Sequence, residues 1–138
     1  MSDTARCKEL LRVAYHVWHE TRGASVDCWM NLLADDVTFG SLAEGAGPAT
    51  FTARVRGKDN LAGYFDGLRR NWEMIYFTVH HFVAEGDRVV AICTTSWRNK
   101  LTNKVCETPK VDVWRFRDDL AIEFYEYYDT AKLMAAAT

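Results

Sequence analysis

The stretch 110–129, KVDVWRFRDDLAIEFYEYYD, constrains the fold most, because it reads as two β-strands joined by a tight turn at Asp118-Asp119. A two-residue turn predicts that Asp112 lies opposite Tyr125. The two faces of this ribbon are both apolar, so neither suits full exposure to water. We therefore expect one face to cover the core and the other to meet a partner, as in a homodimer.

The predicted pairing puts two carboxylates, Asp112 and Asp129, on one face of the ribbon. In a dry pocket, desolvation would raise the pKa of Asp112 and leave a neutral acid that can donate a hydrogen bond. At a sheet edge the same residue would be a hydrated or ion-paired surface acid, and the hairpin alone leaves both interpretations open. Asp129, nearer the end of its strand, would suit a base. The other members of this face are Trp114, Phe116, Glu123, Tyr125 and Tyr127.

Length and charge narrow the class of protein. A chain of 138 residues has the usual size of one domain, so we predict a single domain over residues 1–138. Aromatic residues make up 13% of it, which suits a lined cavity or a large interface. The net charge of −2, with basic residues scattered among acids, argues against a nucleic-acid partner. No apolar run of about 18 residues occurs, so we expect no membrane partner and a cytoplasmic location.

Cysteines and histidines are spread along the chain. The cysteines at positions 7, 28, 93 and 106 form no CxxC pair and have no histidines at ligand spacing. We therefore predict four free thiols, no metal and no cofactor.

The first half of the sequence predicts three helices. An amphipathic helix runs from Thr4 to about Arg22, and its Tyr15 and Trp18 have polar tips that can either reach a cavity or only fill the core. Gly23 ends it, and a short second helix follows. A third helix begins after Gly57.

The second half of the sequence predicts strands. A first short strand at 37–39 interrupts the helices, and long strands at 74–85 and 88–97 then precede the 110–129 hairpin. Helices followed by an antiparallel meander indicate an α+β fold, with one sheet curling over a helical layer and enclosing a cavity. For the last residues, 130–138, a short helix and an unstructured tail are both left open.

Four short motifs carry a resemblance to a known family: LADDVTF at 33–39, VRGK at 55–58, EGDRV at 85–89 and VWRF at 113–116. With the order of elements, they resemble the nuclear transport factor 2 superfamily, especially its SnoaL-like and ketosteroid-isomerase-like branch, over nearly the whole chain. The resemblance implies a cystatin-like cone, in which a curved antiparallel or mixed sheet packs on three N-terminal helices. It also implies an apolar cavity and a homodimer formed through the outer face of the sheet.

The resemblance carries over to particular residues unevenly. Asp112 matches the position where ketosteroid isomerases keep a protonated aspartate in the oxyanion hole. Asp129 falls near the position of an acid/base aspartate in SnoaL-like cyclases. Gly40-Ser41 stands where the isomerase base would lie, and Tyr15 is two residues from the position of the isomerase tyrosine. Steroid isomerase chemistry is therefore not implied.

Two functions remain open from the sequence. One is a cofactor-free isomerase, cyclase or dehydratase acting on an apolar carbonyl or aromatic compound, with Asp129 as base, Asp112 as acid and Tyr15 as hydroxyl partner. The other is a non-catalytic ligand-binding module or dimeric scaffold of the same fold. In either case the residues expected to contact the ligand are Trp18, Trp114, Phe116, Tyr125 and Tyr127.

Overall fold

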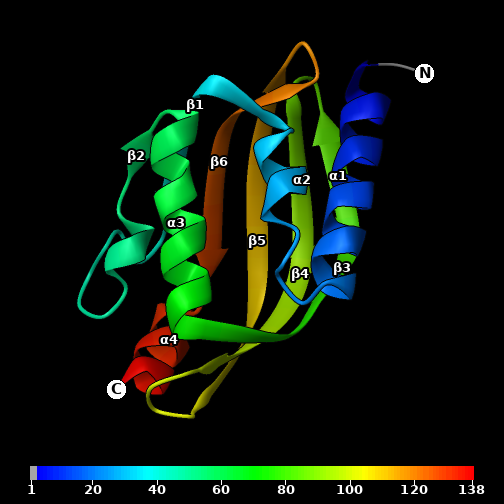
Figure 1. Ribbon diagram of the computed structural model, residues 1–138. Helices are drawn as coiled ribbons and strands as arrows, with labels where there is room; N and C mark the ends of the chain where they lie inside the picture. The colour runs from blue at the N-terminus through cyan, green and yellow to red at the C-terminus, as the bar shows by residue number, and fades with distance from the viewer. Residues whose placement is uncertain (1–2) are drawn as a thin grey trace.

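The computed structural model describes residues 3–138 and shows helices lying across one face of a β-sheet (Figure 1). The first half comprises α1 (Asp3–Glu20), α2 (Val26–Met30), β1 (Leu33–Ser41), the 3-10 turn η1 (Thr50–Thr52), β2 (Val55–Arg56) and α3 (Lys58–Asn71). The second half comprises β3 (Trp72–Glu85), β4 (Arg88–Asn99), β5 (Val105–Arg117), β6 (Leu120–Tyr128) and α4 (Thr130–Ala137).

The sheet has six strands in the order β2-β1-β6-β5-β4-β3. The pairing of β1 with β6 is parallel and the other pairings are antiparallel, so the sheet is mixed. The sheet is open, with β2 and β3 at its edges. The α+β class predicted from the sequence is confirmed, and the last residues form the helix α4 rather than a tail.

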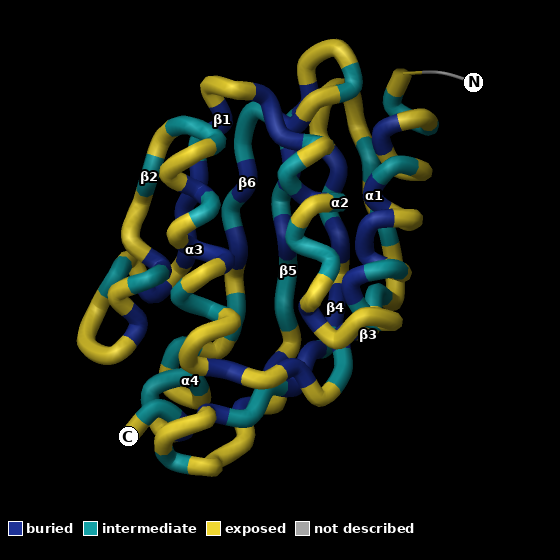
Figure 2. The backbone as a smooth tube through the Cα atoms, viewed as in Figure 1, coloured by how far each residue is buried: buried dark blue, intermediate teal, exposed yellow. Residues whose placement is uncertain are grey.

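The core lies between the helices and the inner face of the sheet. Figure 2 shows the buried residues gathered there, while exposed residues follow the outward sides of the helices. Buried residues of α1 recur at helical spacing, among them Leu11, Ala14 and Trp18, because an amphipathic helix buries one stripe. The strands bury alternate residues for the corresponding reason, since successive side chains point to opposite faces.

A β-bulge in the β5–β6 hairpin corrects the pairing predicted from the sequence. The turn does have two residues, and Phe116 pairs with Ala121 next to it. The register then shifts by one residue, so that Asp112 pairs with Glu126 and not with Tyr125. A shift of one residue moves every later side chain to the other face. Glu126 therefore replaces Tyr125 on the inner face.

Other expectations concern residues away from the hairpin. The four cysteines are free thiols, and three of them are buried. Adjacent residues of a strand point to opposite faces, so the sequence predicts that one of His80 and His81 faces inward. Both are exposed in the structure, where a register shift in β3 lies between Val79 and His81. No helix within residues 3–138 is long and apolar enough to cross a membrane.

The turn η1 packs directly on α3 at Gly67. A Cβ at this position would meet the Phe51 side chain closer than carbon atoms normally approach. A Cβ at Gly63, one turn earlier in the same helix, would meet nothing within 4 Å. The close approach at Gly67 sets the position of Phe51, which packs against the core.

Alanine substitutions at these two glycines should therefore have opposite effects. Gly67→Ala should lower the free energy of unfolding by about 1–3 kcal/mol, because the new methyl group displaces Phe51. Gly63→Ala should raise it by about 0.5–1 kcal/mol, because alanine favours the helix without a clash. Urea unfolding of both variants measures this, and equal stabilisation by both would contradict the close packing of η1 on α3.

Candidate functional site

A buried lysine between two buried carboxylates forms the centre of the site. Lys110 and Asp112 are two residues apart on β5 and so share its inner face. The Lys110 Nζ lies 2.6 Å from Asp112 Oδ1 and 3.1 Å from Glu126 Oε1. The same ammonium lies 5.2 Å from the ring centroid of Phe77 and 5.6 Å from that of Phe124. These ring faces add cation–π stabilisation to the ion pairs.

Asp112 is also held from α1. The Tyr15 hydroxyl donates to Asp112 Oδ2 at 2.5 Å, and the Trp114 indole N–H donates to the Tyr15 oxygen at 2.9 Å. The indole N–H can only donate, so it fixes the direction of the chain. The Tyr15 oxygen therefore accepts from Trp114, and its own proton points at Asp112.

Glu126 is held by a second set of donors. Tyr64 on α3 donates to its Oε1 at 2.8 Å, and Ser41 at the end of β1 donates to its Oε2 at 2.7 Å. Ser41 has one proton, so the Tyr128 hydroxyl, 2.6 Å from Ser41, must donate to it. The backbone N–H of Ala43 in turn donates to the Tyr128 oxygen at 3.3 Å.

These directions match two ionised carboxylates. Asp112 accepts from Lys110 and Tyr15, while Glu126 accepts from Tyr64 and Ser41 and pairs with Lys110. Hydrogen bonds that donate to a carboxylate favour its charged form. Two negative charges and one positive charge then leave the buried network with a net charge of −1.

Burial and charge shift the pKa values in the network in opposing ways. Burial alone would lower the pKa of Lys110, but the charges of Asp112 and Glu126 outweigh it, so the pKa is raised and the ammonium stays charged. Burial raises the pKa of Asp112, which agrees with the dry-pocket interpretation, one of the two that the sequence left open, and Lys110 offsets part of this rise. Burial, together with the neighbouring carboxylate charge, also raises the pKa values of Tyr15 and Tyr64 well above the ordinary tyrosine value. Both tyrosines therefore remain hydrogen-bond donors.

The network borders an aromatic cavity of about 80 Å³. Lys110 and Glu126 are part of its wall, whereas Asp112 lines a smaller adjoining hollow of about 20 Å³. Lys110 and Glu126 are therefore open to the larger cavity, whereas Asp112 is not. The aromatic residues of the cavity wall are Trp18, Phe51, Tyr64, Trp72, Phe77, Trp97 and Tyr128.

Four of the eight residues predicted from the sequence lie at this site or in its walls. Tyr15 and Asp112 form one arm of the network, Trp18 lines the cavity, and Trp114 lines the smaller hollow. Phe116 is buried in the core but lines neither space.

The three remaining predicted residues lie elsewhere. Tyr125 and Tyr127 point to the outer face, because the bulge shifts β6 by one residue, and Tyr127 is 45% exposed. The expectation that they share a face with Asp112 is wrong. Asp129 is exposed and caps α4, with its carboxylate accepting from the Lys132 N–H at 3.0 Å. It does not share a pocket with Asp112.

The sequence interpretation missed the members of the network that depend on long-range pairing. Lys110 could have been found, since its spacing from Asp112 places both on one strand face. Glu126 required knowledge of the bulge. Ser41 required the parallel pairing in which it lies beside Glu126. Within residues 3–138, no group of three or more His, Cys, Asp or Glu side chains is arranged to hold a metal ion.

Comparisons with known proteins agree on the fold. The family model described as the SnoaL-like domain matches residues 12–124. A nuclear transport factor 2-like protein of unknown function from Burkholderia pseudomallei has a similar structure, with a TM-score of 0.84, 22% identity, and coverage of 100% of this chain and 99% of that one. No protein of curated function matches the sequence.

Two further similar structures carry names that mention an activity. A candidate isomerase from Bacillus subtilis has a TM-score of 0.79 at 18% identity and covers 99% of this chain and 95% of its own. An LEH-like epoxide hydrolase from M. tuberculosis has a TM-score of 0.72 at 14% identity and covers 99% of this chain and 92% of its own. At these identities the likeness shows the fold alone.

Replacing Lys110 tests the electrostatic description of the network. Lys110→Met should lower the free energy of unfolding by about 3–5 kcal/mol near neutral pH, because it leaves two buried carboxylates without their cation. The loss should shrink in acid. Without Lys110 the pKa of Asp112 rises further above its unfolded value of about 3.9, so the folded variant binds more protons than the unfolded chain and its stability falls as pH rises above about 4.

Urea unfolding at about pH 5 and about pH 8 measures this difference. The exposed Lys104, replaced in Lys104→Met, is the matched control and should change little at either pH. A loss for Lys110→Met that is the same at both pH values would contradict the ionised network.

Proposed function

The chain belongs to the SnoaL-like domain family, and on that premise we propose that it is a cofactor-free, isomerase-type enzyme that transfers protons on a small, largely apolar carbonyl compound. The observation that carries the proposal is the contact between Lys110 and Glu126 at the cavity wall. It sets a fixed cation beside a carboxylate base. Removal of a proton next to a carbonyl needs these two groups close together.

Lys110 is proposed to bind the carbonyl oxygen. Among the described residues, the hydrogen-bond and ion-pair partners of its ammonium are Asp112 and Glu126. An ammonium has three N–H donors, so a third remains for an oxygen in the cavity. Negative charge develops on that oxygen when the neighbouring carbon loses its proton, and a preorganised cation stabilises it.

Glu126 is proposed to act as the base. Its carboxylate breaks the C–H bond next to the carbonyl and takes the proton, while the electron pair moves toward the oxygen held by Lys110. Return of the proton to a different carbon completes an isomerisation. Asp112 does not line the larger cavity, so its proposed role is to position Lys110 rather than to contact the substrate.

Stability alone gives no reason for this network. Burial of ionised groups carries a desolvation cost, and apolar residues of similar volume are often as stable or more so. Perturbed pKa values beside a cavity are more typical of functional sites. Membership of the SnoaL-like domain family is compatible with this class of chemistry, since a candidate isomerase has the same fold.

We also propose that the protein forms a homodimer through the outer face of the sheet. Ile92 and Val111 are neighbours across β4 and β5 on this face, and Tyr125 and Tyr127 continue it on β6. Ile92 is 37% exposed and Tyr127 is 45% exposed. An apolar patch of this kind is typical of a protein interface.

The proposed reaction predicts catalysed hydrogen exchange in a small ketone. Incubation of propanone with the protein in D₂O should replace the hydrogens next to the carbonyl with deuterium, as followed by proton NMR. Glu126→Gln should slow this exchange by about 10²–10⁴-fold, because the base is lost.

Glu123→Gln is the matched control, since Glu123 lies on the same strand and is half-buried on the outer face. It should exchange at the wild-type rate. Propanone that binds in the cavity but gains no deuterium would identify a non-catalytic binding protein and overturn the proposal.

The dimer proposal predicts a change of mass on substitution of the outer face. Sedimentation equilibrium at micromolar concentration should give a dimer for the wild type and a monomer for Ile92→Asp, because a charge in the interface core is left unpaired. Leu101→Asp changes a 92% exposed residue of the β4–β5 loop and should leave the dimer intact. A monomeric wild type would remove the proposal.

A further inference from the structure

We infer that α4 limits the size of the ligand and that Leu133 is the residue that determines this limit, so that the cavity takes carbonyl compounds smaller than a six-membered ring. This inference rests on the proposed binding of the substrate in the aromatic cavity. It concerns the part of the cavity wall that α4 contributes, which the proposed reaction does not use.

Leu133 is the contribution of α4 to the cavity wall. Around it, α4 packs on a small apolar cluster separate from the main core. Trp72 and Cys106 are buried in this cluster with Ala136 of α4, and both also line the cavity. The helix therefore contributes to the cavity wall a side chain that packs against the cluster of Trp72, Cys106 and Ala136.

Hydrogen bonds hold α4 in place at both ends. At its start, the Asp129 backbone N–H donates to the hydroxyl of Thr108, a cavity residue of β5, at 3.0 Å. The Asp129 carboxylate caps the first turn. At its end, the hydroxyl of Thr102 donates to the Ala136 carbonyl. A helix fixed at both ends keeps Leu133 in one position.

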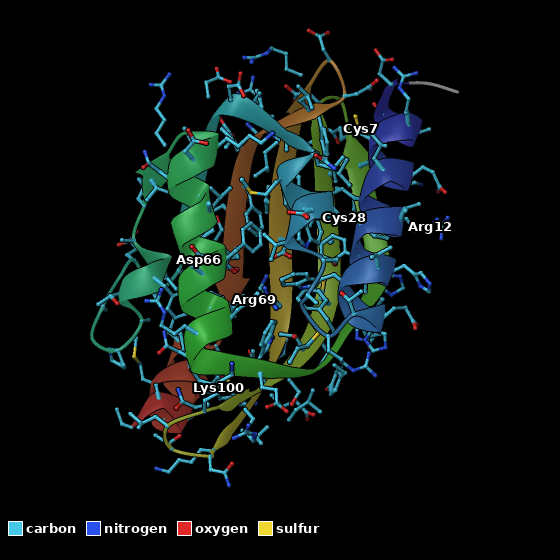
Figure 3. The ribbon with its side chains drawn as sticks, viewed as in Figure 1. Cys7, Arg12, Cys28, Asp66, Arg69 and Lys100 are labelled. Carbon is cyan, nitrogen blue, oxygen red and sulfur yellow. The ribbon has the colours of Figure 1, made fainter. Side chains whose placement is uncertain are left out.

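The loop that carries Thr102 is itself fixed to the end of α3. Figure 3 shows Lys100 and Arg69 at the lower end of that helix, and Figure 1 shows α4 close by. The Lys100 Nζ donates to the Arg69 carbonyl at 2.7 Å, and the Lys100 N–H donates to the Asn71 carbonyl at 2.9 Å. These bonds use carbonyls at the helix C-terminus that have no partner within the helix. The end of α3, the β4–β5 loop and α4 thus form one connected wall.

The volume of the cavity sets the limit. An engineered protein cavity of about 150 Å³ binds benzene, whereas this cavity has about 80 Å³. It therefore has room for the whole of a compound of the size of propanone, whereas a six-membered ring fits inside it only in part. Cutting Leu133 back to alanine would add space of the same order as that engineered cavity, because leucine-to-alanine changes leave cavities that collapse only in part.

The test compares the binding of propanone and cyclohexanone by NMR chemical-shift titration. The wild type should bind propanone in preference to cyclohexanone. Leu133→Ala should bind cyclohexanone at least about tenfold more tightly than the wild type does. Met134→Ala is the matched control, because Met134 is the next residue of α4, is half-buried and does not line the cavity. It should leave both affinities within about twofold of the wild type.

A second variant works in the opposite direction. Leu133→Phe should fill the cavity and weaken propanone binding at least about tenfold. Equal cyclohexanone affinity in the wild type and Leu133→Ala, or unchanged propanone binding by Leu133→Phe, would overturn the inference.

The titration is independent of catalysis, so the two proposals can fail separately. Cyclohexanone that binds to Leu133→Ala without deuterium exchange would support the size limit and contradict the proposed proton transfer. Exchange of cyclohexanone by the wild type at the rate of propanone would support the proton transfer and contradict the size limit.

Discussion

The ammonium of Lys110 is the group on which the arrangement of the inner face depends. It stands between two carboxylates on neighbouring strands, and each carboxylate is in turn held by a tyrosine from a different helix. The two helices α1 and α3 are therefore linked to β5 and β6 through the two carboxylates that bind this ammonium. Removing one partner of a buried ion pair lowers the stability more than replacing both partners by apolar residues, because the remaining charge is buried without water or a counter-charge. The network thus ties the positions of the helices to one another.

Much of the fold could be predicted from the sequence because its signals are local. The helical stripe of α1 and the strand pattern of 74–97 each lie within one short segment, and both were identified with little error. The strand β5 starts at Val105, five residues before the predicted strand, since the intervening residues pair with β4 although Glu107 and Pro109 disfavour a strand. Pairing with a neighbour here outweighs local propensity.

The site could be predicted only in part, and the reason is the bulge. Asp112, Tyr15 and Trp18 were found from the polar and aromatic character of their own segments. The sequence places Tyr127 on the inner face and Glu126 on the outer face, and the structure has the reverse, because one extra residue in β6 changes which of them points inward. No feature of the sequence of residues 120–129 predicts this β-bulge. The exposed position of Asp129 has a different cause, since the chain leaves the sheet there and the carboxylate caps a helix.

The parallel pairing of β1 with β6 has a consequence for the newly made chain. Leu33 pairs with Ala121 and Ser41 with Glu126, so this pairing inside the sheet joins an early and a late segment of the sequence. Contacts of such long separation form slowly, because a large loop must close before they add any stability. During synthesis β1 can pair early with β2, but its other edge stays unpaired until residues 120–128 of β6 are made. An unpaired strand edge of this kind favours aggregation with other chains until the β1–β6 pairing forms.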